Sequence, residues 1–123
     1  MKTRARDLMM VLVVLAAWAP THALEVSHDP GFRVEWTLDP PRRNLVTVAG
    51  YVYNERQDMV RYVQVRIQVL DAAGAVTAQR FHSVVGDIAS NGRAFFNGVV
   101  PAGGAAYRVS VASFQATGGG GGQ

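Results

Sequence analysis

The fold is decided by residues 51–74, which read Tyr-Val-Tyr-Asn-Glu-Arg-Gln-Asp-Met-Val-Arg-Tyr-Val-Gln-Val-Arg-Ile-Gln-Val-Leu-Asp-Ala-Ala-Gly. Its long middle part places an apolar side chain at every second residue: Val63, Val65, Ile67 and Val69. A period of two is typical of a β-strand that buries one face. A charged turn at residues 55–58 precedes this strand, and residues 71–74 reverse the chain after it, because Gly74 accepts a positive φ at no steric cost. Strands joined by such reversals indicate a small sheet protein.

The same pattern recurs along most of the chain. Alternation of apolar and polar residues predicts five further strands, over 32–38, 45–54, 75–85, 93–100 and 107–114. The third of these alternates less regularly, so we expect it at a sheet edge or with a bulge. Gly50 indicates a bulge or the close passage of another side chain, and residues 24–31 read as a polar lead-in. We predict an all-β fold, an antiparallel immunoglobulin-like β-sandwich of about six to seven strands over residues 24–115.

The first 23 residues form a separate unit. Three basic residues precede an uninterrupted apolar run from Leu8 to Trp18, and Thr21-His22-Ala23 then offers the small side chains at which a signal peptidase cleaves. The apolar run is shorter than the roughly 20 residues that a membrane-spanning helix needs. We therefore predict a cleaved signal peptide over residues 1–23, a periplasmic or secreted product, and no stable membrane span after processing.

The charge of the chain does not point to a polyanionic partner. Twelve Lys and Arg stand against nine Asp and Glu, with a sequence pI near 9.8. The predicted signal peptide holds three of the basic residues and one acidic residue, so residues 24–123 carry nine against eight. This near balance predicts no nucleic-acid binding. Residues 116–123 are mostly glycine and are predicted to be a disordered tail.

The chain contains no cysteine. This excludes a disulfide framework, a thiolate metal site, a cysteine nucleophile and a lipidated N-terminal cysteine. A domain of roughly 100 residues must then be held together by burial alone, which is feasible at this length.

Several short motifs carry a resemblance to a known family. They are Gly50-x-Val52-x-Asn54, the alternating run that ends in Leu70-Asp71-x-x-Gly74, Asn91-Gly92-Arg93-Ala94-Phe95, Val100-Pro101 and Tyr107-x-Val109-x-Val111. Over residues 36–114 the chain resembles the FxLYD-type bacterial domain, a small immunoglobulin-like sandwich common in exported proteins. The pentapeptide that names the family corresponds to residues 67–71, which keep only its aspartate, and Asn91-Gly92 stands where Pro-Gly is usual. The resemblance implies no catalytic residues and a scaffold or interaction role.

The histidines suggest one metal-binding constellation. Glu25, His28 and Asp29 lie close together in the sequence, and His82 would be a fourth ligand from elsewhere. Imidazole and carboxylate ligands suit a transition metal. The alternative is a frayed polar segment without a site.

A hydrolase would need His82 together with Asp87 and Ser90. No glycine-flanked serine elbow is present to hold a nucleophile, and an exposed strand histidine beside a solvated loop is the simpler interpretation. We therefore predict that the protein is not an enzyme and that it has no catalytic residues and no cofactor.

Aromatic residues give the main candidate surface. Tyr51 and Tyr53 fall opposite the valine face of their strand, and we expect Tyr62 and Arg66 on the same side of the sheet. If exposed, this surface would stack on a protein, a peptide or a sugar. The alternative is that the tyrosines fill a half-buried strand face.

The function hypothesis follows from this surface and from the lack of a catalytic motif. We predict a non-enzymatic, exported binding or scaffold module of the bacterial cell envelope that interacts with another envelope protein. The alternative hypothesis is a periplasmic protein that binds a small ligand or a transition metal. The identity of the partner and the oligomeric state do not follow from the sequence.

Overall fold

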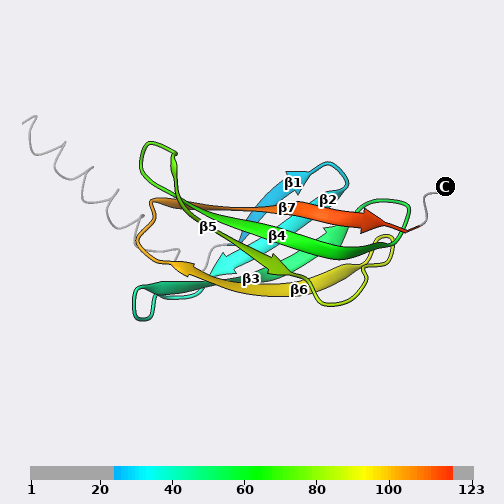
Figure 1. Cartoon of the computed structure of the whole chain (residues 1–123), viewed down its shortest axis with the longest axis horizontal. Helices are drawn as coiled ribbons and strands as arrows, with labels where there is room; N and C mark the ends of the chain where they lie inside the picture. The colour runs from blue at the N-terminus through cyan, green and yellow to red at the C-terminus, as the bar shows by residue number, and fades with distance from the viewer. Residues whose placement is uncertain (1–23, 118–123) are drawn as a thin grey trace, which may run out of the picture.

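The computed structural model describes residues 24–117, so the predicted signal peptide, residues 1–23, and residues 118–123 of the predicted tail lie outside the described part. The described residues form seven β-strands and no helix (Figure 1). The strands are β1 (Glu25–Asp29), β2 (Phe32–Leu38), β3 (Leu45–Asn54), β4 (Val60–Leu70), β5 (Val76–Ser83), β6 (Arg93–Pro101) and β7 (Ala106–Ala116). Over this range no helix is long and apolar enough to cross a membrane.

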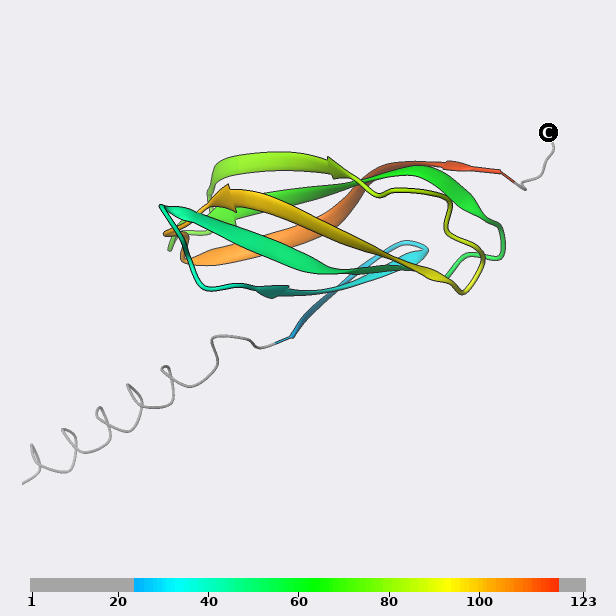
Figure 2. The ribbon, with the colours of Figure 1, turned by 90° about the horizontal axis from the view of Figure 1, so that it is seen from below.

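The strands form two antiparallel sheets that lie face to face (Figure 2). One sheet has the order β1-β2-β3-β6 and the other the order β5-β4-β7. The chain crosses between the sheets after β3, after β5 and after β6. This arrangement is that of an immunoglobulin-like sandwich, in which hairpin neighbours share a sheet and later strands return to it. The predicted fold class is therefore confirmed.

The core lies between the two sheets. Val63, Val65, Ile67 and Val69 of β4 are buried, as their alternation predicted. They share one cluster with the inward residues of the four-stranded sheet: Phe32, Val34, Trp36, Val46, Val48, Val52, Phe96 and Val100. Burying a valine side chain contributes about 1.5 kcal/mol or more. Contact between the layers can therefore hold the domain together without a disulfide.

β5 is an edge strand, as its irregular alternation predicted. A β-bulge that the sequence pattern did not indicate lies near the start of β4. The pairing of β4 with β7 shifts register between Arg61 and Gln64, and Tyr62 has a φ of 53°. The extra residue changes the alternation, so that Val60 and Val63 are both buried while Tyr62 is exposed.

The polar lead-in predicted for residues 24–31 is wrong. Residues 25–29 form β1, which pairs along its whole length with β2. Two side chains of β1 also reach the edge of the other sheet: Ser27 Oγ donates to the carbonyl of Val109 at 2.7 Å, and Asp29 Oδ2 accepts from the N–H of Val111 at 2.7 Å. β1 therefore satisfies polar groups that the edge of β7 would otherwise present to solvent.

Gly50 marks neither a bulge nor the passage of a side chain. The register of β3 with β2 and with β6 is continuous through this residue. A Cβ atom at this position would overlap the carbonyl oxygen of Glu35 and the Cα atom of Trp36. The glycine is therefore required because the backbone of β2 lies too close for any side chain.

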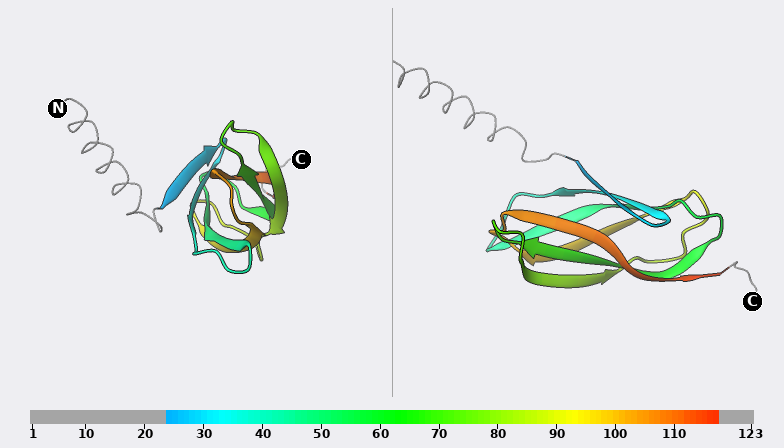
Figure 3. Two further views of the ribbon diagram at one scale, coloured as in Figure 1. Left: turned by 90° about the vertical axis from the view of Figure 1, so that its left-hand side faces the viewer. Right: turned by 90° about the horizontal axis from the view of Figure 1, so that it is seen from above.

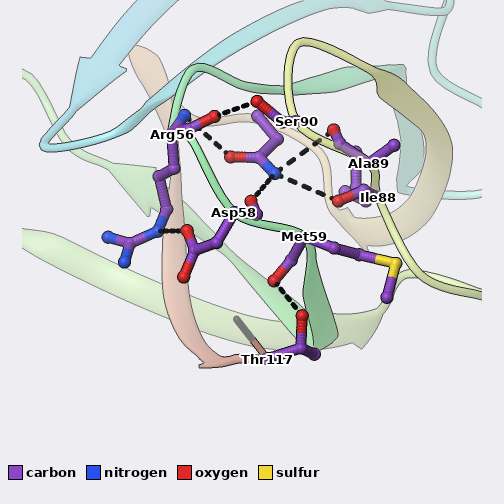
Figure 4. Close-up of polar contacts among 8 residues, drawn as sticks. Arg56, Asp58, Met59, Ile88, Ala89, Ser90 and Thr117 are labelled. Carbon is purple, nitrogen blue, oxygen red and sulfur yellow. Dashed lines mark hydrogen bonds and ion pairs between the residues drawn. The ribbon is translucent and has the colours of Figure 1, made fainter. Parts of the chain in front are cut away.

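Asn54 is the buried polar residue of the core, with an exposed fraction of 0%. Its Nδ2 donates to the carbonyls of Asp58 at 2.8 Å, Ile88 at 3.0 Å and Ala89 at 3.2 Å, and its Oδ1 accepts from the N–H of Arg56 at 2.9 Å. Figure 4 shows the carbonyls of the two loops turned toward this point. One amide thus joins the loop between β3 and β4 to the loop between β5 and β6.

Candidate functional site

The outward surface of the four-stranded sheet carries the candidate site. The alternation that turns Val48 and Val52 of β3 into the core turns Tyr51 and Tyr53 outward. We call the surface around them the aromatic face, which consists of Tyr51 and Tyr53 of β3, Arg33 and Glu35 of β2, and Arg93 and Phe95 of β6. Tyr51 is opposite Glu35 of β2 on one side and Phe95 of β6 on the other. Tyr53 is opposite Arg33 of β2 and Arg93 of β6.

The rings and the guanidinium groups of the aromatic face are stacked on one another. The rings of Tyr51 and Phe95 meet edge to face with centroids 5.7 Å apart, and those of Tyr51 and Tyr53 lie 6.4 Å apart. The guanidinium carbon of Arg93 lies 4.1 Å from the centroid of Tyr51, and that of Arg33 lies 4.1 Å from the centroid of Tyr53. Such cation–π contacts fix long side chains that would otherwise move freely.

A chain of hydrogen bonds crosses the aromatic face from β6 to β2. Arg93 donates to the hydroxyl of Tyr53 at 3.3 Å, and this hydroxyl donates to Glu35 Oε1 at 3.0 Å. Arg33 forms ion pairs with Glu35 at 3.4 Å and with Glu55 at 3.3 Å. The bond to Tyr53 raises the pKa of Arg93 above its ordinary value, so this guanidinium stays charged.

A shallow groove of about 320 Å³ runs over this surface. Its lining is mostly aromatic and aliphatic, with the charged groups of Glu35 and Arg93 at its sides. Leu24, just before β1, lines it at the edge of the sheet. The groove presents stacking surfaces and one cation, which suits binding rather than bond-making chemistry.

A larger hollow of about 410 Å³ lies at the end of the sandwich where β2 ends and β7 begins. Its walls are Leu38, Pro40, Pro41, Val46 and Tyr107, with the two glycines of the turn before β7 and Asp39. The hydroxyl of Tyr107 already contacts Gly104 N–H at 3.2 Å and the carbonyl of Pro101 at 3.4 Å. This hollow therefore offers few free polar groups to orient a ligand.

Tyr62 and Arg66 do not lie on the aromatic face. The expectation that they share a surface with Tyr51 and Tyr53 is wrong, because β3 and β4 belong to different sheets. Arg66 pairs across β4 with Phe81 of β5 and with Ser110 of β7. The sequence pattern could not reveal this, since a turn of five residues between two strands serves equally for a hairpin and for a crossing between layers.

The proposed metal ligands are not brought together. Glu25, His28 and Asp29 lie on β1, whereas His82 lies on β5, at the opposite side of the sandwich (Figure 3). The carboxylate of Asp29 accepts the N–H of Val111 instead. Among residues 24–117 no group of three His, Cys, Asp or Glu side chains could hold a metal ion.

The residues considered for a hydrolase each have other contacts. Ser90 Oγ donates to the carbonyl of Arg56 at 2.6 Å, and Asp87 pairs with Arg61 at 3.4 Å. The ring of His82 lies against Gly98 of β6, where a Cβ atom would overlap it. The three side chains therefore do not form a nucleophile–base pair.

Sequence reasoning missed four members of the aromatic face: Arg33, Glu35, Arg93 and Phe95. They become neighbours of the tyrosines only through the register of β3 with β2 and β6. The available signal was the pair Arg93-x-Phe95, whose spacing of two places both side chains on the same face of a strand.

Comparison with known proteins gives remote structural likeness alone. The sequence matches no protein-family model and no curated protein. A crystal structure of a DUF1425 family member from Shewanella sp. pv-4 is similar over 77% of this chain and 92% of that chain, with 10% identity and a TM-score of 0.42. The X-ray structure of the Northeast Structural Genomics Consortium target SoR45 is similar over 80% of this chain and 89% of that chain, with 13% identity and a TM-score of 0.35.

Proposed function

We propose that this protein is a non-enzymatic binding module of the bacterial cell envelope that recognises another protein through the aromatic face. The observation that carries the proposal is the exposure of Phe95, which is 53% exposed. Its ring packs against the ring of Tyr51, and the guanidinium of Arg93 lies over Tyr51. Aromatic residues and arginine are the residue types enriched at the centres of protein interfaces. Aromatic rings already held by neighbours lose little side-chain entropy when a partner binds.

The envelope setting is part of the proposal and is supported by the basic and apolar leader over residues 1–23. The lack of cysteine is compatible with an exported domain held together by burial. Membership of the FxLYD-type family is likewise part of the proposal and is supported by the motifs of residues 50–54 and 91–95. No observation favours the alternative of a metal-binding protein, since its four ligands lie on two distant strands.

Site-specific photo-crosslinking tests the proposal with a closely matched control. Phe95 is 53% exposed and Phe81, on β5 in the other sheet, is 52% exposed. Each is replaced in turn by p-benzoylphenylalanine in the producing cell, and adducts are detected after irradiation. We expect a discrete adduct from position 95 that position 81 does not give. Equal labelling from both positions, or none from position 95, would refute the proposal.

A pair of serine variants separates binding from folding. Phe95→Ser should abolish the complex with the protein found by crosslinking and lower the unfolding midpoint only slightly, because the ring loses one aromatic contact with Tyr51 and lies outside the core. Phe81→Ser should leave both unchanged. A marked fall in the unfolding midpoint of Phe95→Ser alone would show that the ring is structural.

A further inference from the structure

We propose that Arg93 is the receptor for a carboxylate of an extended peptide segment of the partner, which lies in the groove of the aromatic face. This inference rests on the proposed function and specifies the chemistry of its ligand.

The first support is that Arg93 forms no ion pair with any acidic side chain of the described residues, although its pKa is raised by the hydrogen bond to Tyr53 and, to a smaller extent, by the nearby charge of Glu35. The other arginine of the aromatic face, Arg33, is neutralised by Glu35 and Glu55. Of the ion pairs formed among residues 24–117, none includes Arg93. Its only side-chain hydrogen bond in this range goes to the hydroxyl of Tyr53. Several N–H donors of the guanidinium therefore remain free for an acceptor from outside.

The second support is that Arg93 is already held in place. Its guanidinium lies over the ring of Tyr51 at 4.1 Å and donates to Tyr53, whose hydroxyl donates in turn to Glu35. A long arginine side chain usually loses conformational entropy when it binds a ligand. In this protein part of that entropy is already lost on folding, so less is lost on binding. A planar guanidinium fixed on a ring presents its donor fork in one direction, which is the geometry that a carboxylate accepts through both oxygens.

The third support is the lining of the groove beside this cation. Phe95 and Leu24 provide apolar walls, and the backbone at Gly50 forms part of the floor. Such walls suit the aliphatic or aromatic side chains next to a carboxylate in a peptide. A sugar acid would need partners for many hydroxyl groups, and the groove is lined mostly by apolar and aromatic side chains. Charge complementarity and apolar walls together therefore favour a peptide carboxylate.

Three short peptides serve as probes for the chemistry. Acetyl-Leu-Phe with a free C-terminus carries a terminal carboxylate, acetyl-Leu-Glu-Phe-amide carries a side-chain carboxylate, and acetyl-Leu-Gln-Phe-amide carries none. Each is titrated into the purified, isotopically labelled protein, and binding is followed by NMR at the Arg93 Nε–H group and the ring protons of Tyr51 and Phe95. We expect at least one of the acidic peptides to shift these signals and to bind at least about tenfold more tightly than the neutral peptide.

The outcomes distinguish the source of the carboxylate and test the proposal. A response to the first peptide alone assigns a C-terminal carboxylate, and a response to the second alone assigns an acidic side chain. Both results support a carboxylate receptor. Equal affinity for the neutral and acidic peptides, or no response from any of them, would overturn it.

Arginine variants complete the test. Arg93→Gln should weaken binding of the acidic peptide at least about tenfold, and Arg93→Lys should recover only part of that loss because an ammonium lacks the fork. Arg80→Gln, an exposed position on β5, is the matched control and should change nothing. Unchanged binding by Arg93→Gln would overturn the inference, whereas an adduct from position 95 that survives in Arg93→Gln would leave the proposed function intact.

Discussion

Replacing Asn54 by alanine should produce a large loss of stability from a single buried amide. The two N–H groups of Nδ2 are shared among three carbonyl oxygens at 2.8–3.2 Å, and Oδ1 accepts from the N–H of Arg56 at 2.9 Å. A net contribution of about 1 kcal/mol for each of the two N–H donors and for the one acceptor gives about 3 kcal/mol. The carbonyl of Ala89 lies at an exposed residue and would regain a water molecule, so its loss adds little, and we expect about 3 kcal/mol for Asn54→Ala.

Equilibrium unfolding in urea measures this loss. Trp36 is buried in the core and serves as a fluorescence probe of unfolding. For a domain of this size, about 3 kcal/mol corresponds to a fall in melting temperature of roughly 12–24 °C. Asn97→Ala, on the exposed outer side of β6, is the matched control and should change the free energy of unfolding by less than about 0.5 kcal/mol.

A second variant separates lost hydrogen bonds from lost volume. Asn54→Asp keeps the size of the side chain but places a carboxylate against three carbonyl oxygens. If hydrogen bonding dominates, Asn54→Asp is at least as destabilised as Asn54→Ala at neutral pH, because a buried unpaired charge is costly. A loss below about 1 kcal/mol for Asn54→Ala would refute the reasoning. So would an aspartate variant that is clearly more stable than the alanine variant.

Other variants and conditions test separate features. Gly50→Ala should prevent folding or cost about 3 kcal/mol or more, because its Cβ would overlap the carbonyl of Glu35; Gly86→Ala, with open space but a φ of 86°, should cost only about 1 kcal/mol in urea unfolding. Asp29→Ala should remove one of the two side-chain hydrogen bonds that hold β1 to the edge of β7, which would appear as faster amide hydrogen exchange in β1 and a stability loss of about 1–2 kcal/mol. The raised pKa of Arg93 keeps it charged, so affinity for acidic peptides should be constant at neutral and mildly alkaline pH. It should fall only as the carboxylate of the peptide is protonated, near about pH 4; a decline centred near neutral pH in calorimetric titrations would contradict this.

The strands whose apolar and polar residues alternate regularly could be predicted from the sequence. Val63 to Val69 repeat with a period of two, and every one of their apolar side chains is buried. The β1 strand escaped prediction because its bonds to β7 join residues 82 positions apart, and its own sequence is mostly polar. The bulge beside Tyr62 escaped prediction because one inserted residue leaves no signal in composition.

The candidate site was predictable only in part, because local spacing places residues of one strand but not residues of paired strands. Tyr51 and Tyr53 share a strand, so their common face follows from spacing alone. Arg93 lies beside them only because β6 pairs directly with β3. This pairing joins segments that are far apart in the sequence, so it cannot be read from local spacing. The assignment of Tyr62 to this face failed because the chain changes layers between β3 and β4.

The position of Asn54 also affects how the two layers separate. Two of the three passages from layer to layer lie beside this residue, and one amide ties both. At the far end a single passage is anchored by the N–H groups of Ala102 and Ala105 to the loop before β3 and the last residue of β4. We therefore expect the two sheets to separate last at the end that holds Asn54, so amide hydrogen exchange should be faster around Gly103 than around Ile88.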